Sequence, residues 1–158
     1  NPLLELYHWQ PFINFLARIM EKPAIYPMDD ELSCLNVMAH KQGEALNWHF
    51  DRSEFTTTML LQAPEKGGEF QYACGLRTDQ DPNYDGIGDF LQGDFTSATT
   101  LPLEPGTLNV FKGTNTLHRV TPVKGPIDRI ISIFTYYETP GKRFSAEEQI
   151  GFYGRSTV

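Results

Sequence analysis

Eight short runs of β-forming residues follow one another between Leu32 and Thr139, and this pattern constrains the fold most. The runs are rich in branched and aromatic residues, and Gly, Pro, Asn and Asp separate them, as in turns between strands. Eight short antiparallel strands suggest a two-sheet jelly roll or a barrel. We therefore expect a mainly β core over residues 32–139, with strands near 34–41, 45–50, 55–62, 68–73, 97–103, 107–111, 117–121 and 128–137.

Helical segments are expected at both ends of this core. Apolar side chains recur at spacings of three and four in the first 22 residues, which predicts one amphipathic helix that ends before Pro23. Residues 1–31 would then be an N-terminal helical support. Residues 140–158 would be a C-terminal tail, in which Ser145–Gln149 is typical of a capped helical turn. The N-terminal apolar positions are Leu6, Trp9, Ile13, Leu16 and Met20.

A long insert interrupts the β pattern at residues 75–96. It is rich in Asp and Gly, and Tyr84–Leu91 is compatible with a short helix. A long insertion in a compact β domain is often a functional loop, although a solvated crossover explains the composition equally well. We expect this insert and residues 26–31 to shape a substrate pocket. If the ligand is cationic, Asp79, Asp81 and Asp85 are available as acidic partners, although solvation at the surface explains these three residues equally well.

Length and charge exclude several classes of protein. The chain has 158 residues, which fits one domain over 1–158 but not two. A net charge of −7 argues against a general binder of nucleic acid or of anionic membranes. No apolar run approaches the roughly 20 residues of a membrane span. The first residues are Asn1 and Pro2 rather than Met, which leaves room for missing upstream residues.

The two cysteines, Cys34 and Cys74, do not form a metal-binding spacing with the histidines. We expect two reduced, buried thiols in a cytoplasmic protein, with a disulfide as the open alternative. The oligomeric state does not follow from the sequence.

The strongest chemical signal is the sequence His49-Phe50-Asp51, followed 67 residues later by His118 on another expected strand. Alternate residues of a strand share a face, so His49 and Asp51 point the same way, away from Trp48 and Phe50. Two histidines and one carboxylate form the facial triad of non-haem Fe(II) oxygenases. Each residue alone also has a purely structural explanation. His49 could be a half-buried strand histidine, Asp51 a residue that caps the following turn, and His118 a hydrogen-bonded core histidine.

Arg129 lies 11 residues after His118, in an otherwise apolar strand. In a hairpin of that length the two residues can face the same interior. A buried guanidinium is costly without a partner, and it can bind a carboxylate in a bidentate way. We therefore expect Arg129 to bind a dicarboxylate co-substrate, whereas Arg119 faces outward.

These motifs resemble the Fe(II)/2-oxoglutarate-dependent oxygenases, which have a double-stranded β-helix fold. The resemblance is closest to a bacterial subgroup of free-amino-acid halogenases and hydroxylases, and it covers roughly residues 34–155. It rests on four stretches of sequence: Asn47 to Arg52, Leu61 to Phe70, Leu117 to Val123 and Phe152 to Arg155.

The resemblance implies that His49, Asp51 and His118 bind Fe(II) and are catalytic, and that Arg129 binds 2-oxoglutarate. O₂ would be the oxidant, and succinate and CO₂ would be released. The implied substrate is a small molecule, a free amino acid or a similar metabolite. Halogenating members carry Gly or Ala in place of Asp51, which favours hydroxylation here.

One feature departs from the family pattern. Many members carry Ser two residues after the arginine, where it helps hold the co-substrate, but position 131 is Ile. Ser132 has the opposite strand parity and receives no role. Two other function classes remain open: a non-catalytic cupin-like binding domain, and a Zn-dependent hydrolase using the same three residues. The hydrolase reading leaves Arg129 unexplained.

Overall fold

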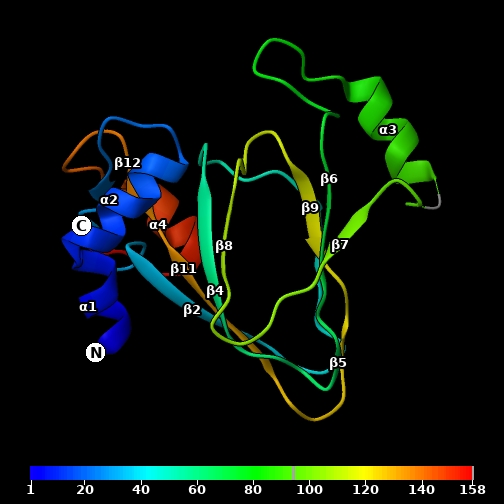
Figure 1. Cartoon of the computed structure of the whole chain (residues 1–158), viewed down its shortest axis with the longest axis horizontal. Coiled ribbons are helices and arrows are strands. Elements are labelled where there is room, and N and C mark those ends of the chain that lie inside the picture. The colour runs from blue at the N-terminus through cyan, green and yellow to red at the C-terminus, as the bar shows by residue number, and fades with distance from the viewer. Residues whose placement is uncertain (94, 158) are drawn as a thin grey trace. The chain divides into compact units, whose positions relative to one another are not determined.

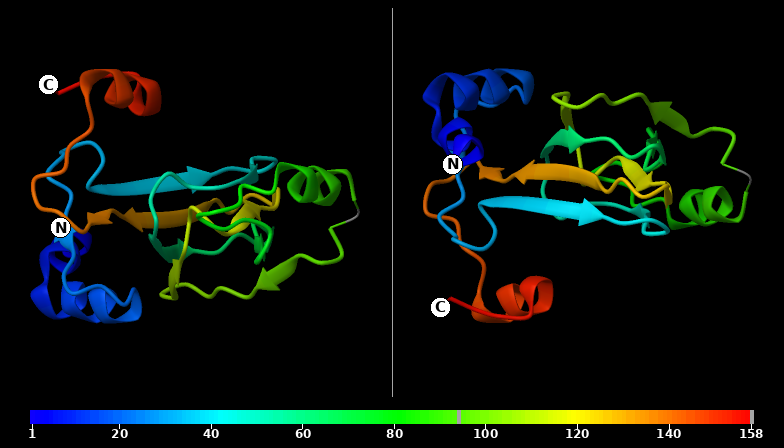
Figure 2. Two further views of the ribbon diagram at one scale, coloured as in Figure 1. Left: turned by 90° about the horizontal axis from the view of Figure 1, so that it is seen from above. Right: turned by 90° about the horizontal axis from the view of Figure 1, so that it is seen from below.

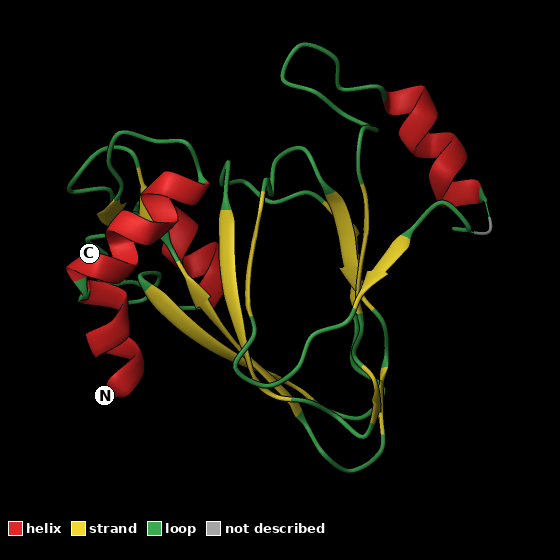
Figure 3. Ribbon diagram, viewed as in Figure 1, coloured by secondary structure: helices red, strands yellow, loops and turns green. Residues whose placement is uncertain are grey.

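The computed structural model describes residues 1–93 and 95–157. It contains four helices and twelve strands in the described residues, and antiparallel strand pairs dominate (Figure 3). The chain divides into two compact units. One combines residues 1–37 with residues 132–158, and the other is the continuous stretch 38–131.

Two four-stranded sheets form the β core. In the first the order is β2-β11-β4-β8, and in the second it is β3-β9-β6-β7. The non-sequential order of strands in both sheets is that of a jelly roll, so the expectation of a mainly β, double-stranded β-helix fold is confirmed (Figure 1). The strand bounds are β2 Leu35–His40, β3 Leu46–His49, β4 Thr56–Gln62, β6 Phe70–Ala73, β7 Thr99–Leu101, β8 Leu108–Phe111, β9 Leu117–Val120 and β11 Arg129–Phe134.

Each of the eight expected runs contains one of these strands, with ends that differ by a few residues. Four additional pieces of strand are each two residues long; three have no counterpart among the expectations, and β12 lies within the expected run 128–137, which the structure divides into two strands. They are too short to show an alternating pattern, and they exist because they pair with each other across the fold. These are β1 (Tyr26–Pro27) with β12 (Tyr136–Tyr137), and β5 (Lys66–Gly67) with β10 (Val123–Lys124).

Register brings the chemically interesting residues of the second sheet together. His118 in β9 lies opposite His49 on one neighbouring strand and opposite Tyr72 on the other. Residues directly opposite each other in antiparallel strands share a face of the sheet. Therefore both histidines project from the same face of this sheet.

The N-terminal helix differs from its expectation. Instead of one helix to residue 22, the chain forms α1 (Pro2–His8) and α2 (Gln10–Ile19), with Trp9 in an extended conformation between them. Pro11 explains the break, because proline has no N–H and its ring clashes with the carbonyl four residues earlier. Proline is well tolerated in the first turn of a helix, and Pro11 lies there in α2.

The other two helices agree with the sequence patterns. The helix α3 (Tyr84–Gln92) occupies the insert and begins at Asn83, whose side chain accepts a hydrogen bond from the Gly86 amide. The helix α4 (Ala146–Tyr153) begins with a capping box between Ser145 and Glu148. No helix in residues 1–93 and 95–157 has the length and apolar character needed to cross a membrane.

Both cysteines are free thiols, as expected, but neither is fully buried. Cys34 is half-buried and Cys74 is exposed. Cys74 follows the last residue of β6, where the chain leaves the sheet for the insert. The expectation of two buried thiols is therefore wrong.

Candidate metal centre

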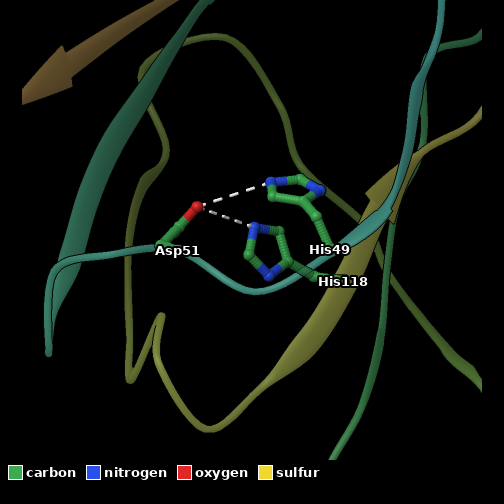
Figure 4. Close-up of side chains that lie close together, drawn as sticks. All are labelled: His49, Asp51 and His118. Carbon is green, nitrogen blue, oxygen red and sulfur yellow. Dashed lines mark ion pairs between the residues drawn. The ribbon is translucent and has the colours of Figure 1, made fainter. Parts of the chain in front are cut away.

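The side chains of His49, Asp51 and His118 converge in the 38–131 unit (Figure 4). The Asp51 Oδ1 atom lies 3.4 Å from Nε2 of His49 and 3.5 Å from Nε2 of His118. The imidazole rings are 4.1 Å apart between centroids and are inclined at 55°. Three of the four residues singled out in the sequence are thus neighbours in space.

Both histidines are oriented in the same way by their own strands. Nδ1 of His49 donates to the carbonyl of Asn47 at 2.7 Å, and Nδ1 of His118 donates to the carbonyl of Thr116 at 2.8 Å. A donor at Nδ1 leaves the lone pair of Nε2 free in the neutral ring. This arrangement fixes the tautomer that a metal ligand needs, since metal-binding histidines usually donate their other nitrogen to an oxygen.

Asp51 is held from two sides. Its amide donates to the carbonyl of Gly113 at 2.9 Å, and its Oδ2 atom accepts a hydrogen bond from the hydroxyl of Thr56. Burial alone would raise the pKa of Asp51. The neighbouring imidazoles of His118 and His49 and the hydrogen bond from Thr56 outweigh burial and hold the pKa of this carboxyl well below its usual range. The carboxyl is therefore ionised, as a metal ligand must be.

Aromatic residues form an apolar wall beside the metal centre. The Phe111 ring lies 4.7 Å and the Phe70 ring 5.6 Å from the His118 ring, centroid to centroid. The side chain of His118 is only 5% exposed, whereas that of His49 is 32% exposed. The centre is consequently closed on the His118 side and open to solvent on the His49 side.

The opposite face of the same sheet carries a separate cluster. Trp48 packs against Phe90 of α3 and against Phe95, and the Arg119 guanidinium lies 4.8 Å from the centroid of the Trp48 ring. Arg119 also donates to the Gln71 side chain at 2.7 Å. The outward direction expected for Arg119 and Trp48 is confirmed, and the cluster braces the strands that carry the two histidines.

The donor set fits a divalent metal ion such as Fe(II). Two ligands at right angles, each about 2.1 Å from a metal, stand roughly 3 Å apart. The distances of 3.4 and 3.5 Å from Oδ1 of Asp51 to the two Nε2 atoms are close to that value and need only small adjustments. Two neutral imidazoles and one carboxylate on one side of the ion leave the other coordination positions open.

Arg129, the fourth residue, lies in the same unit at the first position of β11. Its side chain is almost completely buried, at 1% exposure, and its Nη2 atom has no hydrogen-bond partner among the described residues. Burial lowers its pKa. A guanidinium remains charged nevertheless, so this is a buried cation whose Nη2 lacks a partner in the part of the chain that the structure describes. A carboxylate group is the partner that this geometry calls for.

Gly68 makes room for the stem of Arg129. A Cβ atom at this position would stand 2.9 Å from Cδ of Arg129, and the backbone has a φ of +63° that favours glycine. The pair Gly67-Gly68 is a turn signal in the sequence. The structure adds that the second glycine is needed for packing against the arginine.

Sequence reasoning missed several residues of the centre. Thr56 and Gly113 contact Asp51, but a threonine in a strand and a glycine in a loop carry no signal of their own. Outside the centre, in the other sheet of the same unit, Asn109 lies opposite Thr58, is buried, and has an Nδ2 atom without a hydrogen-bond partner among the described residues. A polar residue in the alternating pattern of 107–111 was the available signal for Asn109.

Part of the insert contacts the loop that precedes His118. Asp79 accepts a hydrogen bond from the Asn115 side chain at 3.1 Å, and the Arg77 guanidinium lies over the Phe50 ring. Asp81 accepts from the amide of Asn83 and thus supports the insert itself. The segment 26–31 belongs to the other unit.

Solved structures of low sequence identity share the fold. An oxidoreductase of the 2OG-Fe(II) oxygenase family from Burkholderia pseudomallei has a TM-score of 0.64 at 16% identity, over 89% of this chain and 57% of that chain. HygX from Streptomyces hygroscopicus with iron bound has a TM-score of 0.52 at 14% identity, over 86% of this chain and 71% of that chain. The chain thus spans little more than half of the first of these proteins.

HygX with nickel and 2-oxoglutarate bound is also similar, with a TM-score of 0.50 at 12% identity, over 88% of this chain and 82% of that chain. Among proteins with curated functions, none matches this sequence significantly. A sequence model of the HalD family, described as Halogenase D, matches residues 1–149. Because that match covers most of the chain, this protein belongs to the Halogenase D family, in agreement with the resemblance of its motifs to the Fe(II)/2-oxoglutarate oxygenases.

Proposed function

We propose that this protein is an Fe(II)/2-oxoglutarate-dependent oxygenase that hydroxylates an unactivated C–H bond of a free amino acid or a similar small metabolite. The observation that carries the proposal is the convergence of two anchored imidazoles and one ionised carboxylate on one point. Membership of the Halogenase D family and the solved structures with iron or 2-oxoglutarate bound support the same class of chemistry.

In this proposal His49, Asp51 and His118 hold Fe(II), which supplies the activation of O₂ when it is bound. The chain's own residues fix the ligands before the metal arrives. The carbonyls of Asn47 and Thr116 keep both Nε2 atoms available, so little reorganisation accompanies binding. Phe70 and Phe111 exclude water from the His118 side of the centre.

Arg129 supplies the charge that selects a dicarboxylic co-substrate. Its buried, unpaired guanidinium would bind the carboxylate of 2-oxoglutarate that is remote from the metal. This residue also favours the oxygenase over a Zn-dependent hydrolase with the same three ligands, because hydrolysis at the metal leaves the buried guanidinium unexplained. A non-catalytic cupin-like binding domain would have the same metal and carboxylate sites. A measurement of activity is therefore needed to distinguish it from the enzyme.

Hydroxylation rather than halogenation is supported by Asp51. Halogenating relatives have Gly or Ala at the corresponding position, which leaves room for chloride. Here a carboxylate fills it, and contacts from Thr56 and Gly113 hold the carboxylate in place. We propose an amino acid or similar metabolite as substrate and the cytoplasm as location, with Asp79 and Arg77 of the insert near the substrate.

The test is an anaerobic titration with Fe(II) and then 2-oxoglutarate, followed by the visible metal-to-ligand charge-transfer band. We expect a band that requires both components and is weakened in Asp51→Ala and Arg129→Ala. The exposed residues Asp89 and Arg155 provide matched control variants, Asp89→Ala and Arg155→Ala, that keep the band. A folded protein without any band would refute the proposal.

The type of oxidation is tested separately. Under O₂, with chloride and a panel of free amino acids, we expect succinate and a hydroxylated product that is independent of chloride. A chlorinated product from the unaltered protein would contradict the assignment as a hydroxylase while leaving the oxygenase class intact. Succinate formation with zinc in place of iron, or without O₂, would contradict the oxygenase class.

A further inference from the structure

Four buried side-chain nitrogens of the 38–131 unit have no hydrogen-bond partner among the described residues, and two of them, on His40 and Arg129, belong to neighbouring strands; the other two are on Trp48 and Asn109. Arg129 is 1% exposed and His40 is 8% exposed. Nη2 of the arginine and Nδ1 of the histidine have no hydrogen-bond partner among the described residues. Buried polar groups are nearly always paired in native proteins, so two orphaned nitrogens indicate a position that a ligand fills.

The two residues lie beside each other. His40 is the last residue of β2 and Arg129 is the first residue of β11. These strands are neighbours in one sheet and run in opposite directions, so the end of one lies next to the start of the other (Figures 1 and 2). The electrostatic influence of Arg129 on His40 agrees with this proximity. Burial and the charge of Arg129 lower the pKa of His40, and Glu44 acts in the opposite direction.

Both orphaned nitrogens can donate a hydrogen bond, and no acceptor contacts either of them among the described residues. The carboxylate of Glu44 accepts a hydrogen bond from the amide of Lys41 at 2.8 Å and thereby closes the turn after β2. A carboxylate from outside the chain has two oxygens and only accepts, so it could satisfy an N–H of the imidazole and one of the guanidinium together. The two orphaned atoms therefore share one kind of ligand.

We propose that His40 is a positioning residue for the co-substrate, donating from Nδ1 to the same carboxylate that Arg129 binds. This inference rests on the proposed function, because it assumes that 2-oxoglutarate is the dicarboxylate. The serine that many relatives carry two residues after the arginine is Ile131 in this chain, so a second donor must come from another strand. His40, on the neighbouring strand, supplies it.

The proposal predicts that His40 contributes to binding only when the ligand has a carboxylate remote from the metal. 2-Oxopentanoate has the carbon chain of 2-oxoglutarate but ends in a methyl group, so it can reach the metal without engaging His40 or Arg129. Loss of the His40 donor should weaken binding of 2-oxoglutarate and leave binding of 2-oxopentanoate unchanged. If His40 had only a structural role, its replacement would weaken the binding of both 2-oxo acids alike.

Affinities are measured by anaerobic calorimetry with the Mn(II)-loaded protein, so that no turnover is needed. We expect His40→Leu to raise the Kd of 2-oxoglutarate by about tenfold, as for the loss of one charge-assisted hydrogen bond. His40→Asn should retain most of the affinity, because its amide nitrogen can replace Nδ1. The control is His8→Leu, which removes an exposed histidine on α1 and should change neither Kd.

The unaltered protein provides a second measurement that does not depend on the folding of variants. With diamagnetic Zn(II) bound, ¹⁵N-labelled imidazole signals should show a hydrogen-bonded Nδ1–H of His40 after 2-oxoglutarate is added. The same signal should be absent with 2-oxopentanoate. An unchanged His40 signal with bound 2-oxoglutarate would overturn the inference.

The outcomes separate the inference from the proposed function. If the unaltered protein prefers 2-oxoglutarate and Arg129→Ala abolishes the preference, the co-substrate site exists. The inference is then overturned if His40→Leu keeps the full preference for 2-oxoglutarate over 2-oxopentanoate. It is also overturned if His40→Leu weakens the binding of both ligands equally. A protein that binds neither 2-oxo acid refutes the proposed function and the inference together.

Discussion

Gly113 lies so close to Asp51 that no side chain fits between them. A Cβ atom on the glycine would stand 2.7 Å from both Cβ and Oδ2 of Asp51, and 2.6 Å from the Thr56 hydroxyl oxygen. The glycine carbonyl also accepts the hydrogen bond from the Asp51 amide. The position of the Asp51 carboxylate in the metal centre therefore depends on a neighbouring residue that has no side chain.

The first prediction concerns this contact. Gly113→Ala should displace the Asp51 carboxylate and weaken metal binding by about tenfold or more, as changes around metal ligands commonly do. The Kd of Mn(II) measured by calorimetry or electron paramagnetic resonance tests it. Gly88→Ala is the matched control, since a Cβ there meets nothing within 4 Å. An unchanged Kd in Gly113→Ala would show that the carboxylate tolerates displacement.

A second prediction concerns the hydroxyl that orients Asp51. Thr56→Val keeps the shape of the side chain but removes the donor to Oδ2. We expect the affinity for Mn(II) to fall by about tenfold while the fold is retained, because the carboxylate loses its orientation. Thr100→Val, on an exposed position of β7, is the control. Equal affinities of the two variants would argue against an orienting role of Thr56.

The alternating pattern of the sequence was sufficient for the strands and for three of the site residues. His49, Asp51 and His118 were found because strand parity and spacing determine which side chains share a face. The break at Trp9 was missed, because the apolar spacing of residues 6–20 continues across Pro11 as if one helix ran through it. Pro11 requires a new helix to begin near residue 10, and this constraint outweighs the apolar periodicity.

Contacts made by residues without periodicity could not be derived from the sequence. Gly113 and Thr56 act through distances of a few ångström to Asp51, and such distances depend on how two loops pack. His40 shows a different limit. Its histidine was visible in the sequence, but its proximity to Arg129 arises from the pairing of strands about 90 residues apart, which a local pattern does not encode.

A third prediction addresses the stability of the unit formed by the two ends of the chain. Tyr7 is 0% exposed, and its hydroxyl donates to the Thr135 carbonyl and accepts from the Met28 amide, both at 2.6 Å. Tyr7→Phe would remove both of these hydrogen bonds and leave only the longer bond, 3.2 Å, from the Met28 amide to the Thr135 carbonyl. We expect the free energy of unfolding to fall by about 1–3 kcal/mol. Chemical denaturation measures it, and Tyr84→Phe, at a 79% exposed position, should have no effect.

A fourth prediction concerns Asp30, a 6% exposed carboxylate that ties three segments of the same unit together. It accepts hydrogen bonds from the amides of Leu32, Ser33 and Phe144 and from the Gln149 side chain. Burial would raise the pKa of Asp30, but these four hydrogen bonds outweigh burial and lower it. Asp30→Asn replaces an ionised acceptor by an amide, so we expect a loss of about 1–3 kcal/mol in unfolding free energy at pH 7.

The pH dependence of that loss follows from the lowered pKa. The carboxyl binds a proton less readily in the folded than in the unfolded chain, so its contribution is complete above the unfolded pKa of about 3.9 and disappears as the pH falls through the folded pKa. The difference in unfolding free energy between the unaltered protein and Asp30→Asn should therefore shrink below about pH 4. Asp29→Asn is the control, because Asp29 pairs with Arg143 on the surface and exposed ion pairs contribute little. A difference that stays constant down to pH 2 would mean that the ionised carboxylate is not what holds these segments.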